Sequence, residues 1–442
     1  MTPNTSSYLL SRVFQAWNPF MSYLFYPIVL ILSVTIVRLT LALLVFLPLY
    51  ITIQGFLASI TGLKNAHLLL TSTGRRTLIR DSDCWRHYEY YYYHNIPIRD
   101  VFRTDVNTCL KIAAWSPHVE EFDLHDMRVR FVHEKPLDRG VQPSGQTIIL
   151  LHGNPSWSFM WRKIIPVLTQ HGHEVYALDW IGYGLSDKPL KPFEIAPGLH
   201  GVTLKTLIRL YSITDCYIVA HDWGGCIALS TIPDLPLGTC KGLFLLNSFF
   251  LPRPNDSSLN SYTRYVIWFF VTGALGVLLP EWAIMHYMNP QISSHALRGF
   301  SAPFYGGIKT KTSIKRFTQI LPGIPDFILS LRCTPRWRMI EGLLGPPKFT
   351  NINEQATLAA QNHVHRNWWK SISKGQPKVT IIFGRNGPLV DFKEVLENGI
   401  NARLRVDGLN RGWIDGAGHY PSEDKPLEVA NAILLFLDKV NA

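Results

Sequence analysis

Short apolar runs alternate with stretches of helical length from about Met127 to the C-terminus. The first run, 127–134, alternates apolar and polar residues as a half-buried strand does. The later runs are continuous and apolar, which is typical of a parallel sheet covered on both faces; they lie at 146–153, 173–180, 215–222, 242–248 and 378–384. Stretches such as 161–170 have helical length. We therefore predict a doubly wound α/β fold with a mostly parallel sheet and a site at the carboxyl ends of its strands.

The N-terminal part of the chain has a different pattern, because residues 23–60 are almost free of charge. About 20 apolar residues cross a bilayer, so this run suits one tilted transmembrane helix or a hairpin of two shorter ones. It is too long for the apolar part of a secretory signal and has no clear small-residue cleavage site. A buried core helix is the alternative. We expect a membrane anchor, with Arg38 near an interface because a charge at the bilayer centre is costly.

The basic residues around this run indicate its orientation. Lys64, Arg75, Arg76 and Arg80 follow the run, whereas only Arg12 precedes it. Cationic flanks tend to stay on the cytoplasmic side of a membrane. If the run crosses once, the rest of the chain is predicted to be cytoplasmic, and a hairpin would place both flanks there.

The overall charge and the cysteines change this picture little. Lys and Arg number 43 against 32 Asp and Glu, a formal net charge of +11, which suggests nucleic acid or an anionic membrane surface as a partner. The basic residues are scattered rather than interleaved with aromatics, so no nucleic-acid partner is expected. The six cysteines lack CxxC spacing, and neither HExxH nor a Gly-rich dinucleotide fingerprint occurs. No metal or organic cofactor is therefore expected.

A candidate nucleophile follows the run 215–222. Ala220, His221, Asp222, Trp223 and Gly224 have the order of a nucleophile elbow, a sharp strand-to-helix turn with small residues on both sides. An Asp that only caps the next helix is the alternative. A carboxylate at this position gains little by attacking an ester, but attack on a saturated carbon gives a stable alkyl ester. The elbow therefore favours displacement of a halide or opening of an epoxide.

The second step of such a reaction needs a base and an oxyanion hole. Water activated by the base would hydrolyse the ester at its carbonyl, with the backbone N–H groups of Asn154 and Trp223 stabilising the oxyanion. His419 is the candidate base, because it lies among glycines near the C-terminus, between a strand-like stretch at 403–408 and a helix predicted from Pro426 onward. We assign no role to the other histidines, His221 included.

Several segments resemble the haloalkane dehalogenase family, which is related to the epoxide hydrolases. They are HGNPSWS at 152–158, DWIGYGLSDKP at 179–189, VAHDWGG at 219–225, GFSAPF at 299–304 and RFTQILP at 316–322. The resemblance extends from about Glu121 to the C-terminus. It implies an α/β-hydrolase fold with a helical lid, a small apolar substrate, and a leaving halide held by Trp223 and Asn154. Indole and amide N–H groups both donate to an anion, which agrees with those roles.

The sequence departs from the family at the acid that orients the histidine. In the family this acid follows either the strand that ends near Asn247 or the one that ends at Gly384. Asn247 is not an acid, and Gly387 stands where the second Asp is expected. Asp391, four residues later, is the remaining candidate. Without an acid, His419 loses its orienting partner and the ester would turn over slowly.

These observations divide the chain into five parts: an N-terminal tail at 1–22, a membrane anchor at 23–60, a connector at 61–120, a hydrolase core at 121–250 and 370–442, and a lid at 251–369. The predicted function is that of a membrane-anchored, haloalkane dehalogenase-like hydrolase. One alternative is an epoxide hydrolase, which needs two lid tyrosines; the candidates are Tyr262, Tyr265, Tyr287 and Tyr305. The other is an inactive, membrane-tethered binding protein.

Overall fold

A computed structural model of the chain describes residues 98, 100–136, 140–190, 195, 197–248, 280–314, 377–387 and 410–441. All of them belong to the unit that extends from Arg76 to Ala442. The predicted tail, the anchor at 23–60 and Asp391 lie outside the described residues. Within the ranges given above, no helix has the length and apolar character needed to cross a membrane.

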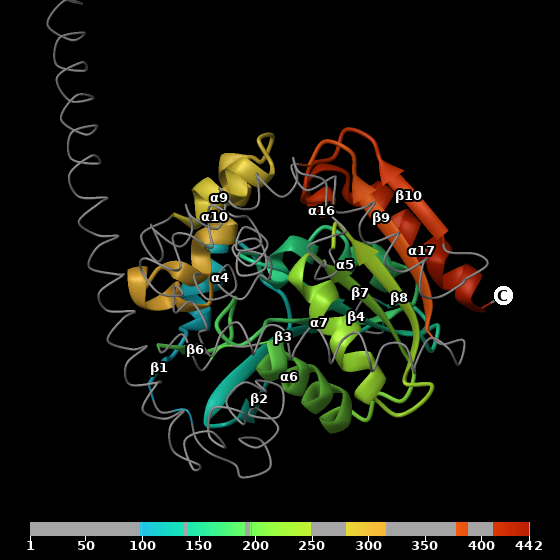
Figure 1. Cartoon of the computed structure of the whole chain (residues 1–442), viewed down its shortest axis with the longest axis horizontal. Helices are drawn as coiled ribbons and strands as arrows, with labels where there is room; N and C mark the ends of the chain where they lie inside the picture. Colours follow the sequence, from blue (N-terminus) through green and yellow to red (C-terminus); the bar gives the residue numbers. More distant parts are fainter. Residues whose placement is uncertain are drawn as a thin grey trace, which may run out of the picture. The chain divides into compact units, whose positions relative to one another are not determined.

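The described residues build an eight-stranded sheet with the order β10-β9-β8-β7-β4-β5-β3-β2 (Figure 1). Its strands are β2 (Val119–Leu124), β3 (Met127–Glu134), β4 (Thr147–Leu151), β5 (Glu174–Leu178), β7 (Cys216–His221), β8 (Cys240–Leu246), β9 (Lys378–Gly384) and β10 (Asn410–Ile414). Pairing is parallel from β5 through β4, β7, β8 and β9 to β10, and β3 pairs antiparallel with both β5 and β2. The predicted mostly parallel sheet is therefore confirmed.

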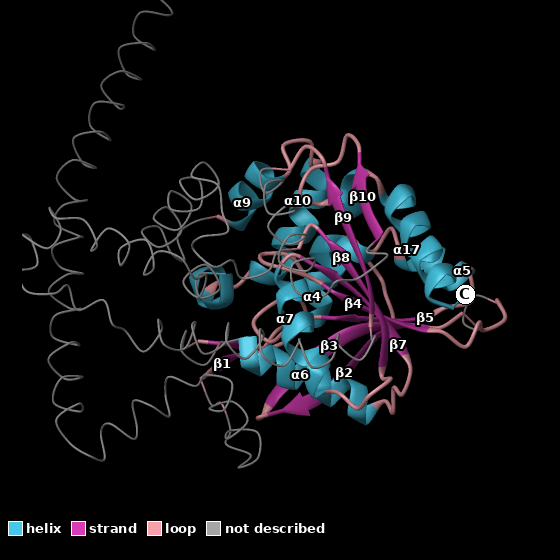
Figure 2. Cartoon of the chain, turned by 45° about the vertical axis from the view of Figure 1, so that its right-hand side comes forward, coloured by secondary structure: helices cyan, strands magenta, loops and turns pink. Residues whose placement is uncertain are grey.

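Helices cover both faces of this sheet. Figure 2 shows α5 (Ile165–Gln170) and α17 (Pro426–Asn441) on one face, and α6 (Pro197–Leu210) and α7 (Trp223–Thr231) on the other. Every residue of β7 is buried, as expected for a strand covered on both sides. The continuous apolar runs in the sequence have this origin.

The described part of the range expected as a lid is helical. It contains α9 (Glu281–Met288), α10 (Ser294–Ser301) and the 3-10 helices η7 (Ala302–Phe304) and η8 (Gly307–Thr310). The end of the range expected as a connector is folded too. There, β1 (Val101–Phe102) pairs with β6 (Lys188–Pro189), and α4 (Val106–Ala113) packs against α10 and η7.

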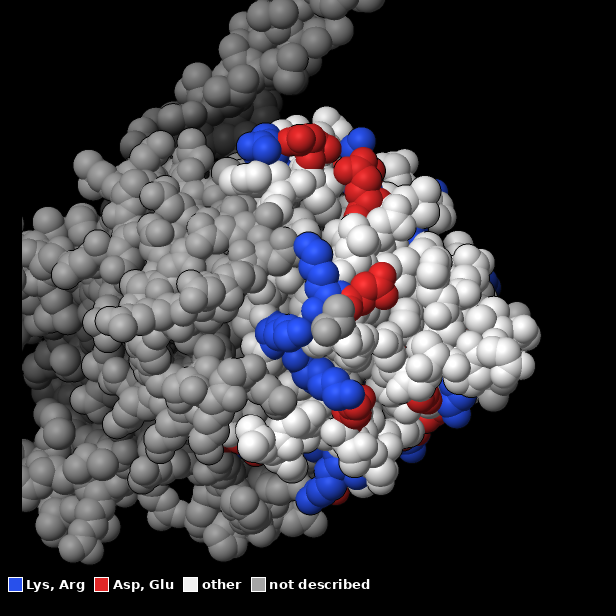
Figure 3. Space-filling model, turned by 90° about the vertical axis from the view of Figure 1, so that its right-hand side faces the viewer, with Lys and Arg blue, Asp and Glu red and all other residues white. Residues whose placement is uncertain are grey.

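Charged side chains of both signs lie on the described surface. On the face shown in Figure 3, Lys and Arg lie close to Asp and Glu, with wide uncharged areas between the groups. Among the described residues, Arg128 and Glu121 form an ion pair, with 2.9 Å between Nη1 and Oε1. This mixed pattern is typical of a solvated surface.

Candidate active site

The elbow after β7 places Asp222 at the carboxyl end of a central strand. Asp222 has φ 52° and ψ −123° at the N-cap of α7, a backbone conformation that non-glycine residues seldom adopt. The turn also needs glycine nearby: a Cβ on Gly224 would lie 2.7 Å from the carbonyl oxygen of His152. A Cβ on Gly153 would lie 2.3 Å from Oδ1 of Asp222. The loop after β4 therefore approaches the carboxylate closely, and α7 lies directly against the end of β4.

The Asp222 carboxylate is buried but well supplied with donors. Its side chain accepts a hydrogen bond from the backbone N–H of Asn154, with 2.9 Å between N and Oδ1, and one from the backbone N–H of Trp223. Nε2 of His419 lies 3.4 Å from Oδ2. Burial alone would raise the pKa of Asp222, but the His419 ring and the backbone donor outweigh it and hold that pKa below its ordinary value. The carboxylate is therefore ionised at neutral pH.

The loop between β10 and the short helix α16 (Pro421–Asp424) holds His419 in place. His419 is 1% exposed, and its backbone N–H donates to the carbonyl oxygen of Met288 at the end of α9, 3.3 Å away. A Cβ on Gly384 would lie 2.1 Å from the carbonyl oxygen of Gly418, so the end of β9 lies directly against this loop. The loop is thus fixed between the sheet and a helix of the predicted lid.

His221, for which no role was predicted from the sequence, also positions His419. Its ring is fully buried, and Nε2 donates to the backbone carbonyl oxygen of His419, 2.8 Å away. Burial and the neighbouring His419 ring lower the pKa of His221 to about 3, so it is neutral when it makes this bond. The sequence contained one signal for this role: His221 lies in the elbow, at the end of a strand whose residues are all buried.

The position expected for the orienting acid lies beside His419 but has no side chain. A Cβ on Gly387 would lie 3.1 Å from the backbone nitrogen of His419. Among the described residues, Nδ1 of His419 has no hydrogen-bond partner. The Asn247 side chain instead accepts from the backbone N–H of Gly384, with 2.8 Å between Oδ1 and N, and joins the ends of β8 and β9. Asp391 lies outside the described residues and stays a prediction.

The two residues expected to hold a leaving atom lie next to Asp222. Trp223 begins α7 and is 4% exposed. The Asn154 amide oxygen accepts from the Tyr183 hydroxyl, with 3.1 Å between Oδ1 and Oη, so its NH₂ group remains available as a donor.

Two of the candidate lid tyrosines lie elsewhere, because Tyr287 is 55% exposed and the Tyr305 hydroxyl accepts from the backbone of Asp105, 2.9 Å away. The other two lid candidates are outside the described residues.

Glu423 in α16 fastens the His419 loop to the core. Its carboxylate accepts two hydrogen bonds from the Arg162 guanidinium, at 2.7 and 2.9 Å, and one from Nζ of Lys163 at 2.6 Å. Burial raises the pKa of Glu423, but these two cations outweigh it and lower that pKa below its ordinary value.

We expect Glu423→Gln to lower the free energy of unfolding at pH 7 by about 3 kcal/mol, because it leaves the largely buried Arg162 without its carboxylate. Since the folded pKa of Glu423 lies below the unfolded value of 4.5, this contribution is present above that pH and is lost as the pH falls through the folded pKa. Urea unfolding of both proteins at pH 7 and near pH 3 checks this. A difference that is as large in acid as at pH 7 would contradict the ion-pair explanation.

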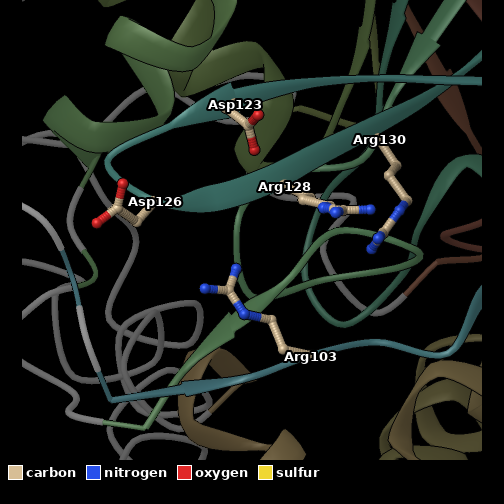
Figure 4. A pocket seen from close by; sticks show the side chains of 5 residues that line it. All are labelled: Arg103, Asp123, Asp126, Arg128 and Arg130. Carbon is tan, nitrogen blue, oxygen red and sulfur yellow. The ribbon is translucent and has the colours of Figure 1, made fainter.

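A pocket of about 600 Å³ lies away from Asp222, beside the β2–β3 hairpin, and its lining residues are shown in Figure 4: Arg103, Asp123, Asp126, Arg128 and Arg130. The arginines already have acidic partners. Arg103 and Arg130 bind the buried Asp187, at 2.6 and 3.3 Å, and Arg130 and Arg128 both bind Glu121. These pairs fasten the edge of the sheet, so we assign the pocket no substrate.

Metal binding finds no support in the part of the chain that the structure describes. No group of three or more His, Cys, Asp or Glu side chains there is arranged to hold a metal ion. The expected absence of a cofactor stays a prediction for the whole chain.

The sheet order, the elbow after β7 and the buried carboxylate–imidazole pair are the features of an α/β-hydrolase, and the chain belongs to the alpha/beta hydrolase fold family, which matches residues 146–426. Within that family it is haloalkane dehalogenase-like. It is 32% identical to the haloalkane dehalogenase of Psychrobacter cryohalolentis over 125 residues. These aligned residues make up 28% of this chain and 39% of that enzyme. It is 26% identical to epoxide hydrolase A of Mycobacterium tuberculosis over 317 residues. This alignment covers 67% of this chain and 91% of that enzyme.

Solved structures agree on the fold. Haloalkane dehalogenase DpaA of Paraglaciecola agarilytica NO2 superimposes with a TM-score of 0.58 at 22% identity, covering 76% of this chain and 98% of that one. At this identity the likeness supports the α/β-hydrolase fold alone. The predicted fold class and family resemblance are confirmed; the membrane anchor stays a prediction.

Proposed function

We propose that this chain hydrolyses small apolar substrates at an electrophilic saturated carbon, as a haloalkane dehalogenase does, through a covalent ester on Asp222. The observation behind the proposal is the Asp222 carboxylate itself. It is 4% exposed, accepts from the Asn154 backbone at 2.9 Å, and has Nε2 of His419 3.4 Å from its other oxygen. A buried, ionised carboxylate beside an imidazole suits attack on carbon followed by base-assisted hydrolysis.

The two carboxylate oxygens have different roles in this mechanism. Oδ1 is held by the backbone donor of Asn154, so it becomes the carbonyl oxygen of the ester. Oδ2 attacks the carbon and displaces the leaving atom, which the Asn154 amide and the Trp223 indole stabilise. His419 then takes a proton from water, and the hydroxide adds to the ester carbonyl. The negative charge that develops on Oδ1 stays within reach of the backbone donors of Asn154 and Trp223.

This order of bond breaking is tested by isotope labelling of the full chain. The product alcohol keeps Oδ2, and the oxygen of water enters the Asp222 carboxyl group. A single turnover of 1-bromohexane in ¹⁸O-water should therefore label the peptide that contains Asp222 and leave the alcohol unlabelled. Label in the alcohol, with none in the protein, would rule out the ester.

Epoxides are the second candidate substrate, because the match to epoxide hydrolase A covers 91% of that enzyme. Release of bromide from 1-bromohexane, measured against formation of diol from 1,2-epoxyhexane, separates the two activities. The inactive binding protein remains the non-enzymatic alternative, favoured by the lack of a partner for Nδ1 of His419 among the described residues. Failure of folded protein to form an ester with either compound would favour it.

We further propose that residues 23–60 anchor the chain in a membrane with the hydrolase on the cytoplasmic side. The nearly uncharged run and the cations that follow it support this placement. Alkaline extraction should leave the full chain with the membranes, and protease added to sealed vesicles with their cytoplasmic face outward should digest the hydrolase. Extraction into the supernatant would contradict the anchor.

A further inference from the structure

Two tyrosines of the hydrolase core, rather than of the predicted lid, are buried near Asp222. Tyr183 follows β5 and is 1% exposed, and Tyr420 follows His419 and is fully buried. The Tyr183 hydroxyl donates to the Asn154 amide oxygen, whereas the Tyr420 hydroxyl has no hydrogen-bond partner among the described residues. A buried hydroxyl without a partner lowers the stability of the fold, so its presence calls for an explanation.

The surroundings of Tyr420 place it against the catalytic groups. Its ring centroid is 5.1 Å from that of His419, 5.0 Å from that of His221 and 5.7 Å from that of Phe300 on α10. Burial is the largest cause that raises the pKa of Tyr420, and the negative charge of Asp222 raises it further. The same two causes raise the pKa of Tyr183. Tyr420 also raises the pKa of Tyr183. The Tyr420 ring therefore lies against the imidazole whose Nε2 is 3.4 Å from the Asp222 carboxylate.

We propose that Tyr420 is a further catalytic residue, whose hydroxyl donates a hydrogen bond to the leaving atom while Asp222 bonds to carbon. The inference rests on the proposed function and deepens it. Tyr183 holds the amide oxygen of Asn154, so the amide NH₂ and the Tyr420 hydroxyl can both donate to the leaving atom beside the Trp223 indole. The substrate would supply the acceptor that Tyr420 lacks.

The electron and proton balance differs between the two kinds of leaving atom. With a haloalkane, the carbon–halogen bond breaks, the halide leaves with the electron pair, and no proton moves. With an epoxide, a ring C–O bond breaks and the oxygen takes both the electron pair and the Tyr420 proton. The proton that His419 removes from water then restores the phenol, and the second hydrogen of that water ends on the alcohol released from the ester.

The electrostatics change in favour of donation as the ester forms. Before the reaction, burial and then the charge of the Asp222 carboxylate raise the pKa of Tyr420 well above its ordinary value, so the phenol is protonated. Ester formation removes the charge from Asp222 and places negative charge on the leaving atom. The hydroxyl thus keeps its proton until an acceptor appears, which is what a proton donor requires.

The test compares Tyr420→Phe with Tyr217→Phe in the full chain. Tyr217 is also buried and on β7, but its hydroxyl bonds Asn441 at the opposite end of the strand from Asp222. The rate of ester formation is measured by rapid-quench intact-mass spectrometry with four substrates: 1-iodohexane, 1-bromohexane, 1-chlorohexane and 1,2-epoxyhexane. We expect Tyr420→Phe to slow ester formation from the chloride at least 10-fold more than ester formation from the iodide. Ester formation from the epoxide should slow at least 100-fold. Tyr217→Phe should match the wild type.

Each other outcome overturns the inference. Equal slowing with every leaving group would mean that Tyr420 only supports the structure, and no slowing would mean that its hydroxyl is not a donor. In both cases the wild type still forms the ester, so the proposed function survives. If the folded wild type forms no ester with any of the four compounds, the proposed function and the role of Tyr420 fail together.

Discussion

The His419→Gln variant should form the alkyl ester on Asp222 and then stop. Attack on carbon needs the ionised carboxylate and the donors to the leaving atom, and the backbone N–H groups of Asn154 and Trp223 are unchanged by the substitution. Hydrolysis needs a base near the ester, and the amide of glutamine is not one. Since general-base catalysis contributes about 10²–10⁴-fold, we expect ester hydrolysis to slow about 1,000-fold.

Intact-mass spectrometry after exposure to 1-bromohexane measures this arrest. The variant should gain the mass of one hexyl group in place of a proton and keep it, while the wild type should show only a transient ester. Asp222→Asn should show no adduct. His171→Gln is the matched control, because His171 is exposed and its ring donates to the carbonyl oxygen of Val167. Loss of the adduct at the wild-type rate would exclude His419 as the base.

The central strands could be predicted from the sequence because burial on both faces leaves a local signal. The predicted bounds of β3 and β9 agree with the structure residue for residue. The edge strand β2 was missed, and β10 begins two residues after the strand-like stretch at 403–408, which lies outside the described residues. β2 contains Glu120, Glu121 and Asp123, and an edge strand tolerates such residues because one side stays open to solvent. Glu120 is instead paired with His133 of β3 at 2.7 Å, a contact that the local pattern does not contain.

In the site, too, features within short motifs could be predicted from the sequence, whereas contacts between distant residues could not. Asp222, Trp223 and Asn154 belong to short motifs whose spacing depends on one turn, so their proximity could be predicted from the sequence, while their roles stay predictions. The role of His221 depends on a hydrogen bond to His419, 198 residues away in the chain. Tyr420 was passed over for a similar reason, because its hydroxyl matters only once the loop after β10 lies beside β7. Such contacts follow from the fold rather than from spacing.

The acid that orients His419 leads to the second large prediction. Asp391→Asn should slow hydrolysis of the Asp222 ester about 10⁴-fold and leave ester formation almost unchanged, since removing a triad acid leaves the imidazole without the partner that stabilises its charged form. We expect Gly387→Asp, added to Asp391→Asn, to restore much of that rate. The Cβ of the new residue would lie 3.1 Å from the backbone nitrogen of His419, close but short of a severe clash.

Both variants are compared with the wild type by the decay of the hexyl ester after the substrate is removed. Gly387→Asn, in the same background, is the matched control, because it adds the same bulk beside His419 without the charge. If Asp391→Asn hydrolyses the ester at the wild-type rate, Asp391 is not the acid. If Gly387→Asp alone then accelerates hydrolysis at least 10-fold, the natural chain works without an orienting carboxylate. Slow turnover of the wild type would then follow from Nδ1 of His419, which lacks a partner among the residues described.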